Sequence, residues 1–399
     1  MFSIEKIFHA REVLKEVAVE TEVLRASKIF CNNQIYLKSE NLQNTGSFKL
    51  RGAYYKISQL SDEEKKRGVI ACSAGNHAQG VALAATKNGI KSVICLPEGA
   101  PISKVMATKG YGAEVCMVKG VYDDAYQKAL ELKEKYGYTL IHPFDDEDVI
   151  AGQGTIALEI LEQMPDIDAI VVPVGGGGLI SGIAYAVKQI KSKIKVYGVQ
   201  AEGAPSMVES IKQNKRITLP GVSTVADGIA VKQPGELTYE ICKKYVDDMF
   251  TVSEDEIASA ILMLMERKKL IAEGAGAVSV AAALFNKLPI KDKKVCCLVS
   301  GGNIDVNKLN RIIVRGLINS GRRISLTMQV QDKPGQFSEV TRVLADNGAN
   351  LISAYHERTG FANFNICQIK VEIETRDFQH IETIKKNLSS NGFKIVEQC

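Results

Sequence analysis

The 399-residue sequence predicts an α/β protein with parallel sheets in two lobes, followed by a small α+β unit. Three observations support this fold class. From Val69 to Tyr136, strand-like and helix-like patterns alternate, which is typical of parallel sheets joined by crossover helices. A second alternating series runs from Ile150 to Val299. After Arg323 the order becomes strand, helix, two strands, helix, strand, which is the order of a ferredoxin-like unit.

The individual elements follow from local patterns. Near the N-terminus we expect a helix at Phe2–Glu20, a strand at Gln34–Leu37, and a helix beginning at Phe48 with Ser47 as its N-cap. The first series has strands at 69–72, 92–96 and 114–117 and helices at 77–88, 102–109 and 123–136. The second has helices at 150–163, 179–191, 254–269 and 275–284 and strands at 169–174, 195–200 and 294–299. Ser253 and Glu256 predict a capping box for the helix at 254.

The C-terminal unit begins after a polar, glycine-containing boundary at Gly316–Arg323. Its expected strands lie at 324–330, 351–357, 366–373 and 393–396, and its expected helices at 337–347 and 378–388. Gly348 follows the first of these helices, as glycine commonly does at a helix end.

Composition limits the class of protein. Hydrophobic residues make up 45% and charged residues 24%, which is ordinary for a soluble globular chain. The net charge of +4 is spread along the chain, so we expect no nucleic-acid partner. No apolar run reaches membrane-spanning length, so we expect no membrane association. The nine cysteines are scattered without metal-ligand spacing, which favours reduced thiols, a cytoplasmic location and no bound metal.

A lysine at a helix start is the first chemical signal. The run Ser39–Tyr55 passes through the polar turn Asn44–Ser47 and then begins a helix, with Lys49 in the first turn. The helix dipole disfavours an ammonium group at this end. A lysine whose pKa is lowered is typical of Schiff-base chemistry. A solvent-exposed lysine beside a buried Phe48 is the alternative interpretation.

Two glycine-containing loops strengthen the signal. The apolar run 170–174 breaks into Gly175–Gly178 and resumes as a helix from Leu179; bare N–H groups at such a helix start suit a phosphate. A flexible turn is the alternative for this loop. The run Cys72–His77 opens another helix and offers small residues and an amide, which suit a carboxylate. A Schiff-base lysine, a phosphate-binding loop and a carboxylate-binding loop are together the groups that would bind pyridoxal phosphate and an amino acid.

Five motifs, in this order, resemble those of the threonine/serine dehydratases, which have the tryptophan-synthase-β fold (pyridoxal-phosphate fold type II). The motifs are SFKLRGA around Lys49, SAGNHAQGVA at 73–82, AGQGT at 151–155, PVGGGGL at 173–179 and SGGN at 300–303. The resemblance covers about residues 5–320. It implies a two-lobed catalytic domain at 1–320, with a smaller lobe at about 53–150.

The resemblance also implies roles for individual residues. Lys49 is expected to hold the cofactor covalently and to act as the base at the substrate α-carbon. Cofactor binding is assigned to Phe48, Lys49, Asn76, Gly175, Gly176, Gly177, Gly178, Leu179 and Ser300. Substrate binding is assigned to Ser73, Ala74, Gly75 and His77. In the family the serine at Ser300 faces the pyridine nitrogen, which favours loss of a β-hydroxyl over transamination. Glu273 matches an acidic position near the ring, and its role stays open.

The implied activity is that of a threonine ammonia-lyase, a carbon–nitrogen lyase that converts L-threonine to 2-oxobutanoate and ammonia. L-Serine giving pyruvate is the expected side reaction. The product feeds isoleucine synthesis or fermentative breakdown. A serine dehydratase or serine racemase on the same scaffold, a β-replacement synthase and a non-catalytic amino-acid sensor are the alternatives. Racemases of this family have a second serine where Ala74 stands, so we expect elimination without racemisation.

The C-terminal segment, about 323–399, resembles an ACT regulatory domain through its Asp-Lys-Pro-Gly turn at 332–335 and its Asn-Gly-Ala-Asn turn at 347–350. This resemblance implies a homodimer or homotetramer that binds a small amino-acid effector between copies, isoleucine or valine first. The expected effector-binding residues are Asp332, Gly335, Gln336 and Phe337, with Asn350 and Leu351 nearby. A dimerisation module that binds nothing is the alternative.

Overall fold

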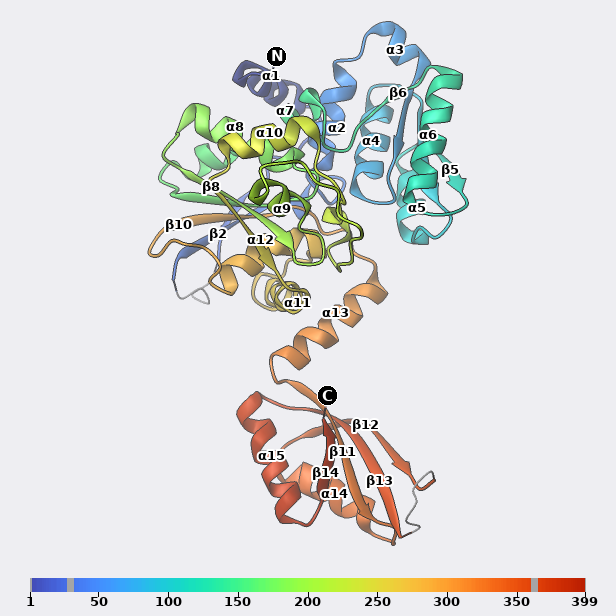
Figure 1. Cartoon of the computed structure of the whole chain (residues 1–399), viewed down its shortest axis with the longest axis vertical. Coiled ribbons are helices and arrows are strands. Elements are labelled where there is room, and N and C mark those ends of the chain that lie inside the picture. The colour runs from blue at the N-terminus through green and yellow to red at the C-terminus, as the bar shows by residue number, and fades with distance from the viewer. Residues whose placement is uncertain (1, 27–31, 360–364, 399) are drawn as a thin grey trace. The chain divides into compact units, whose positions relative to one another are not determined.

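The computed structural model describes residues 2–26, 32–359 and 365–398 (Figure 1). The chain divides into two compact units, Met1–Leu309 and Asn310–Cys399. The first unit contains two predominantly parallel sheets and the second contains one antiparallel sheet. The predicted fold class, α/β with parallel sheets followed by a ferredoxin-like unit, is therefore confirmed.

The larger sheet of the first unit has six strands. In spatial order they are β1 (Val23–Arg25), β2 (Gln34–Ser39), β10 (Lys294–Val299), β7 (Ala169–Pro173), β8 (Lys195–Ala201) and β9 (Asp248–Val252). Only the β1–β2 pair is antiparallel among these pairings. The helices associated with this sheet in the chain are α1 (Ile4–Leu14), α2 (Lys49–Ser58), α7 (Glu147–Gln163), α8 (Gly178–Ile190), α9 (Ser206–Lys212), α10 (Glu236–Tyr245), α11 (Glu254–Met263) and α12 (Gly274–Leu284).

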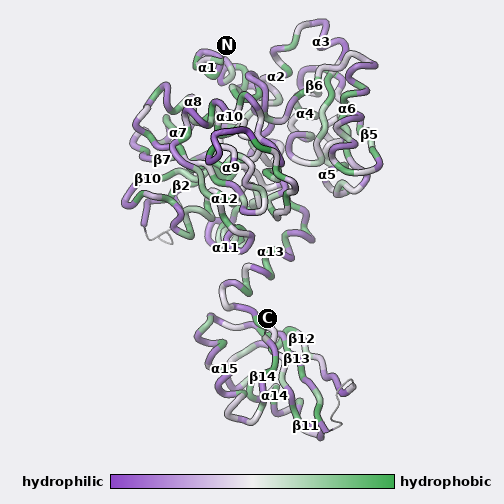
Figure 2. Tube along the Cα trace, in the orientation of Figure 1, coloured by the Kyte–Doolittle hydropathy of each residue, from purple (hydrophilic) through white to green (hydrophobic). Residues whose placement is uncertain are grey.

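The smaller sheet has four parallel strands, in the order β5 (Glu114–Val118), β4 (Ser92–Pro97), β3 (Val69–Cys72) and β6 (Thr139–Leu140). Its helices are α3 (Asp62–Arg67), α4 (Asn76–Lys87), α5 (Ile102–Gly110) and α6 (Tyr122–Tyr136). Helix α3 is charged at every position and has no buried residue, and it is hydrophilic throughout in Figure 2.

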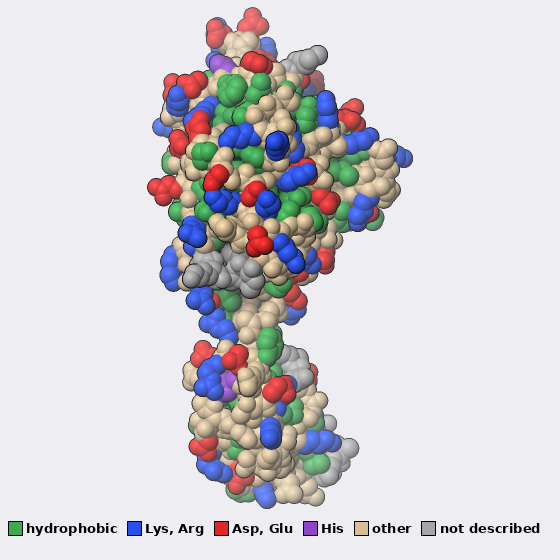
Figure 3. Space-filling model, turned by 90° about the vertical axis from the view of Figure 1, so that its left-hand side faces the viewer, with side chains coloured by type: hydrophobic (Ala, Val, Ile, Leu, Met, Phe, Trp, Pro, Cys, Tyr) green, Lys and Arg blue, Asp and Glu red, His purple; other side chains and the backbone are tan. Residues whose placement is uncertain are grey.

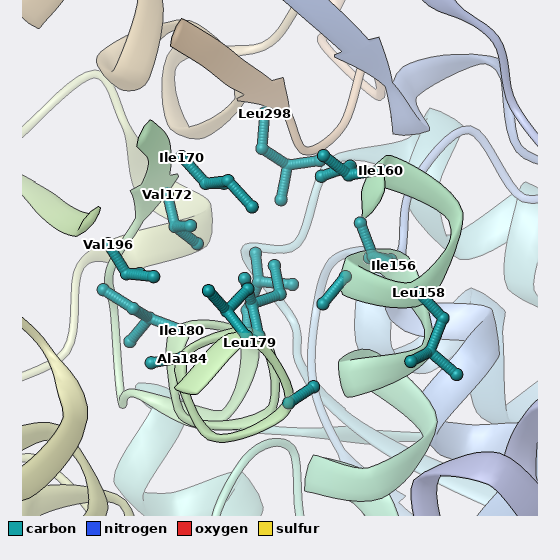
Figure 4. Close-up of a cluster of buried hydrophobic side chains, with 14 of the residues drawn as sticks. Ile156, Leu158, Ile160, Ile170, Val172, Leu179, Ile180, Ala184, Val196 and Leu298 are labelled. Atoms are coloured by element: carbon teal, nitrogen blue, oxygen red, sulfur yellow. The ribbon is translucent and has the colours of Figure 1, made fainter. Parts of the chain in front are cut away.

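One apolar core lies between the six-stranded sheet and helices α7 and α8 (Figure 4). Ile170 and Val172 of β7 face Ile180 of α8, and Ile156 of α7 joins them. All four side chains are buried. These strands and helices are nearly continuous apolar runs because both faces of a parallel sheet are covered.

Glycines in two motifs allow α2 to pack closely on α7. A Cβ added at Gly52 would lie 2.7 Å from the Val149 carbonyl oxygen, and one added at Gly152 would lie 2.6 Å from the Arg51 carbonyl oxygen. The backbones therefore approach more closely than any side chain permits. This contact explains the glycine of SFKLRGA and the first glycine of AGQGT, and it positions the first turn of α2, where Lys49 lies.

The second unit begins within α13 (Val306–Asn319) and contains a four-stranded antiparallel sheet. Its strands, in spatial order, are β12 (Asn350–Glu357), β13 (Ile366–Glu374), β11 (Arg323–Gln331) and β14 (Lys394–Gln398). Helices α14 (Gln336–Asp346) and α15 (Phe378–Ser390) contribute Val340, Leu344 and Ile384 to the core on the sheet. All the predicted elements of this unit are present, with ends shifted by one or two residues.

Two local predictions are wrong, and the predicted helix at 254–269 is confirmed as far as Lys268 with a change of helix type. The first helix ends at Leu14 rather than Glu20, because the Gln43 side chain donates to the Val19 carbonyl (2.9 Å) and accepts from its N–H (2.8 Å), which holds that segment outside the helix. Ser47 is not an N-cap: it forms a bridge to Gly301, and Phe48 precedes α2 instead. Helix α11 continues from Leu264 as one π-helical turn, and it ends where Lys269 adopts a positive φ of 59°.

Further elements were not predicted, namely β1, β6, β9 and the helices α3, α9, α10 and α13. Helix α13 runs through Gly316, where we expected a boundary to begin, and the turn follows it, with Gly321 at φ 68°. The capping box of Ser253 and Glu256 is confirmed, with bonds of 2.8 and 3.2 Å.

The surface carries mixed charge. On the face shown in Figure 3, basic and acidic side chains are interspersed. Among the described residues, no helix combines the length and apolar character that a membrane crossing needs.

Candidate active site

A cavity of about 620 Å³ lies in the first unit, where the loops that follow β3, β7 and β10 meet. Loops after the carboxyl ends of parallel strands commonly build binding sites in α/β proteins. The cavity is lined by all the residues that the sequence predicts for cofactor and substrate: Phe48, Lys49, Ser73, Ala74, Gly75, Asn76, His77, Gly175, Gly176, Gly177, Gly178, Leu179 and Ser300. The fold therefore brings together four motifs that lie far apart in the sequence.

Lys49 is the first residue of α2, and its side chain reaches the cavity. Its Nζ donates a hydrogen bond of 2.6 Å to the Pro143 carbonyl and lies 5.3 Å from the centre of the Phe48 ring. Desolvation of the amine lowers the pKa of Lys49 to about 8, although attraction to Glu273 opposes the change. A substantial fraction of the amine is therefore neutral near physiological pH, which a nucleophile or base requires.

The glycine loop after β7 forms an uncapped helix start. Gly177 precedes α8 with φ 101°, a conformation that favours glycine, and no side chain caps the helix. Thr238 fixes the loop, because its hydroxyl donates a hydrogen bond of 2.6 Å to the Gly176 carbonyl. The first N–H groups of a helix have no partner within it, and they attract anions. Because Gly178 and Leu179 line the cavity, this end can receive a phosphate.

Asn76 and Glu273 form a polar pair inside the cavity. Asn76 Nδ2 donates to Glu273 Oε1 (2.6 Å), and Asn76 Oδ1 accepts from Asn303 Nδ2 (2.8 Å). Desolvation raises the pKa of Glu273 to about 7, and repulsion by Asp227 adds to the effect. Asn303 belongs to the SGGN motif but received no role from the sequence; the structure shows that it orients the Asn76 amide.

Ser300 follows β10 and is buried in the cavity wall. Its hydroxyl donates a bond of 3.3 Å to the Ala275 carbonyl. A hydroxyl can rotate toward a nitrogen in the cavity, but it carries no permanent charge to hold a proton there.

His77 is neutral and structural in this arrangement. Its Nε2 bonds to the Ile141 carbonyl (2.8 Å), which accepts the ring N–H. Burial, helped by the charge of the nearby Lys49, lowers the pKa of His77 to about 3. The His77 ring therefore does not titrate near neutral pH. Its backbone N–H, at the uncapped start of α4, remains the group suited to a substrate carboxylate.

Charged residues that the sequence did not single out also line the cavity. Asp227 and Lys104 line it, and Asp227 lies 3.4 Å from Lys104 Nζ and 3.3 Å from the Nζ of Lys308, which lies outside the cavity lining. Desolvation alone would raise the pKa of Asp227, but the two ammonium groups bring it below the usual value. These residues come from three separate segments without a motif, so only the fold could reveal them.

Comparisons with known proteins agree with this geometry. Residues 15–301 match the model of the family described as pyridoxal-phosphate-dependent enzyme, and residues 324–373 match that of the ACT domain. The chain belongs to the pyridoxal-phosphate-dependent enzyme family. It is 50% identical to the L-threonine ammonia-lyase of Thermotoga maritima, over 99% of each chain. It is 46% identical to the catabolic L-threonine dehydratase of Escherichia coli K12, over 78% of this chain and 95% of that one.

Solved structures with names from this family superpose on about four fifths of the chain. Processed threonine deaminase isoform 2 of Solanum lycopersicum has 40% identity and a TM-score of 0.76, over 79% of this chain and 88% of that one. Maize serine racemase has 36% identity and a TM-score of 0.74, over 79% of this chain and 98% of that one. The family is thus shown by both sequence and fold.

The residues of the cavity fit pyridoxal phosphate. A largely desolvated lysine amine, an uncapped helix start bordered by glycines and a hydroxyl at the end of β10 line the same cavity. These groups match the aldehyde, the phosphate and the ring nitrogen of the cofactor, in that order.

The predicted effector residues lie apart within one chain. Asp332 pairs with Arg358 through bonds of 2.9 to 3.1 Å, and Gly335 precedes α14 with φ 94°. The register pairs Gln331 with Ile366, whereas Asn350 pairs with Glu374. Ile366 and Glu374 are eight positions apart on β13, which corresponds to roughly 26 Å at the usual rise per residue of a strand. Asn350 and Leu351 are therefore not near Asp332 in the same chain, contrary to expectation.

The remaining predicted effector-binding residues are accessible to solvent. Phe337 is 36% exposed, with its ring 6.2 Å from that of His356, and Leu351 is 41% exposed. Gln336 donates to Glu339 (3.3 Å), and Asn350 donates to Glu374 (2.8 Å).

Proposed function

We propose that this protein is a threonine ammonia-lyase, which converts L-threonine to 2-oxobutanoate and ammonia with pyridoxal phosphate and acts on L-serine as a side reaction. The observation that carries the proposal is the meeting of Lys49, the Gly175–Leu179 helix start and the Ser300 hydroxyl in one cavity. Near-complete similarity to an L-threonine ammonia-lyase supports it. We assign catalysis to residues 1–320 and regulation to residues 323–399.

Each group of the cavity has a role in holding the cofactor. The N–H groups from Gly175 to Leu179 would bind the phosphate, Asn76 would donate to the ring hydroxyl, Phe48 would pack on the ring and Ser300 would lie beside its nitrogen. When bound, pyridoxal phosphate supplies an electron sink for negative charge at the substrate α-carbon.

The remaining chemistry belongs to the protein. The substrate carboxylate accepts hydrogen bonds from Ser73 and from N–H groups at the start of α4, which fixes the substrate in the cavity. The Lys49 amine, about half neutral near pH 8, removes the α-proton. Because the Ser300 hydroxyl does not retain a proton on its partner nitrogen, charge at the α-carbon is stabilised only briefly, and loss of the β-hydroxyl is favoured.

Racemisation is the second candidate, because maize serine racemase shares this fold at 36% identity. Inverting the α-carbon needs a proton donor on the face opposite the base. Ala74 lines the cavity where the racemases have a serine, and a methyl group has no proton to give. We therefore favour elimination.

The direct test is a keto-acid assay of the purified holoenzyme with L-threonine, with L-serine and without substrate, combined with chiral analysis of the remaining serine. Turnover of threonine at a higher kcat/KM than serine, without D-serine, supports the proposal. Keto-acid formation from serine alone assigns a serine dehydratase instead, and D-serine at a comparable rate assigns a racemase.

We also propose that the second unit binds an amino-acid effector between two copies of the chain. Strand β12 is an edge strand of its sheet and exposes Leu351, Ile352 and Tyr355. Antiparallel pairing of two β12 edges would bring Asn350 of one copy to the Asp332 end of the second copy. In this arrangement the effector residues near Asp332 and those near Asn350 would meet, each from a different copy of the chain. The arrangement therefore requires a homodimer or a larger oligomer.

Isoleucine and valine are the first effectors to test, because product-pathway feedback would use them. We expect either to shift the apparent threonine affinity by about 5- to 150-fold. The assay titrates each amino acid at sub-saturating threonine, in the full-length chain and in a chain that ends at residue 320. A full-length enzyme that responds to no amino acid would leave the second unit as an assembly module.

We propose a cytoplasmic location, because reduced thiols are typical of that compartment. The described cysteines are free thiols, and those of the sheets, such as Cys296 and Cys297, are buried apolar side chains.

A further inference from the structure

Three side chains with different ligand chemistry converge at one end of the sheet in the second unit. Asp332 directly follows β11, His356 lies on β12 and Cys367 lies on the central strand β13. One ligand atom from each of the three lies within 4.8 Å of the others. His356 Nε2 and Cys367 Sγ are 3.2 Å apart. The sequence could not reveal this group, because its members come from three strands and lack the spacing of a metal motif.

The distances are close to those of a metal centre. With a Zn–S bond near 2.3 Å and a Zn–N bond near 2.0–2.1 Å at a tetrahedral angle, sulfur and nitrogen lie about 3.6 Å apart. The observed 3.2 Å therefore requires only a small side-chain adjustment. Cys367 is 1% exposed and fixed by the core, whereas His356 is exposed, so the histidine can adjust.

Arg358 is positioned to orient the Asp332 carboxylate. Arg358 donates to both oxygens of Asp332, with Nη2–Oδ2 at 2.9 Å and Nε–Oδ1 at 3.0 Å. Such partners orient ligating carboxylates in metal sites. One oxygen of Asp332 can stay with Arg358 while the other binds a cation. Phe337, in the first turn of α14, lies beside the histidine, with its ring centre 6.2 Å from that of His356.

We propose that Asp332, His356 and Cys367 form a binding site for a divalent transition-metal ion, Zn²⁺ in the first instance. Thiolate and imidazole ligands select this class of ion over Mg²⁺ and Ca²⁺, which prefer oxygen ligands. Three protein ligands leave a fourth position for water or another donor. Binding replaces the S–H bond of Cys367 by a metal–sulfur bond and releases one proton to solvent. The proposal does not depend on the reaction assigned to the first unit.

The experiment titrates the metal-free, full-length holoenzyme with Co²⁺ and with Zn²⁺. We expect one ion per chain, with thiolate-to-cobalt charge transfer in the near ultraviolet and intense visible bands typical of tetrahedral cobalt. Difference spectra against the cobalt-free holoenzyme remove the absorbance of the cofactor. Zn²⁺, followed by calorimetry, should displace the cobalt and abolish these bands.

Two variants locate the site. Cys367→Ser should abolish the charge-transfer band. His356→Gln, at an exposed position where the fold does not depend on the side chain, should weaken Zn²⁺ binding by more than about 100-fold, because loss of an outer partner alone costs 10–100-fold. Glu357→Gln, the neighbouring exposed carboxylate, is the matched control and should bind as the parent does. Absence of stoichiometric binding, or binding that His356→Gln and Cys367→Ser leave unchanged, would overturn the proposal.

Discussion

Removal of Arg51 should destabilise the first unit more than removal of any surface arginine. Arg51 is 1% exposed, and it makes two bonds of 2.8 Å to Glu40 and two to Glu159, at 2.5 and 3.0 Å. Lys38 Nζ bonds to Glu159 as well, at 2.5 Å. This buried charge cluster of Lys38, Glu40, Arg51 and Glu159 contains two positive and two negative groups, so it is neutral as a whole.

In Arg51→Met, the buried carboxylates of Glu40 and Glu159 are left with the Lys38 ammonium as the one positive group of the cluster. Removing one partner of a buried ion pair typically costs about 3–5 kcal/mol, because the remaining charge is desolvated without compensation. Combining Arg51→Met with Glu40→Gln restores neutrality, so we expect the double variant to be less destabilised than the sum of the two single variants, by about 1–3 kcal/mol. Arg11→Met is the control, since the Arg11–Glu162 pair is exposed and such pairs contribute about 0–1 kcal/mol.

The assay is urea unfolding of the holoenzyme near pH 7, followed by circular dichroism and by the visible absorbance of the bound cofactor. Desolvation acts to raise the pKa of Glu40, but attraction to Arg51 lowers it below the usual value. Stability from this pair is therefore present above the unfolded pKa and is lost as the pH falls through the folded value, so the effect of Arg51→Met should shrink in acid. A loss below about 1 kcal/mol at pH 7, or strictly additive variants, would refute this view of the cluster.

Three further predictions concern the cavity. Lys49→Ala should abolish turnover while circular dichroism stays unchanged, because the covalent anchor and the base are lost together; activity within tenfold of the parent would exclude the assignment. Ala74→Ser should introduce D-serine formation from L-serine, measured by chiral chromatography, and an unchanged product mixture would show that this position does not control racemisation. Burial raises the pKa of Glu273 to about 7, so its protonated form is favoured in the folded state and stability falls as the pH rises from its unfolded value through 7. The free energy of unfolding of Glu273→Gln should therefore rise relative to that of the parent between pH 5 and pH 8, by roughly 3 kcal/mol at most. Melting temperatures measured across this range check it, and parallel pH profiles would contradict it.

The sequence by itself determined most of the parallel strands and crossover helices, and it identified the cofactor- and substrate-binding residues that line the cavity. Short apolar runs identified the parallel strands, because burial on both faces demands continuous apolar residues there, and the 3.6-residue period identified the crossover helices. Lys49, Gly175–Leu179 and Ser300 could be found because each follows a strand or opens a helix, where backbone geometry restricts the residue types. Glycines such as Gly52 stood in motifs because the α2–α7 contact leaves no room for a side chain.

The tertiary structure alone decided the environment of those residues. Ser47 had the sequence of an N-cap, but pairing with Gly301 took its backbone elsewhere. The pKa of Lys49 is lowered by desolvation, which depends on walls contributed by distant segments and not on its own helix alone. Strand register placed Asn350 far from Asp332, while it brought Asp332 close to Cys367. Contacts between strands arise from pairing across the sheet, and a local sequence pattern carries no information about which ends of two strands will meet.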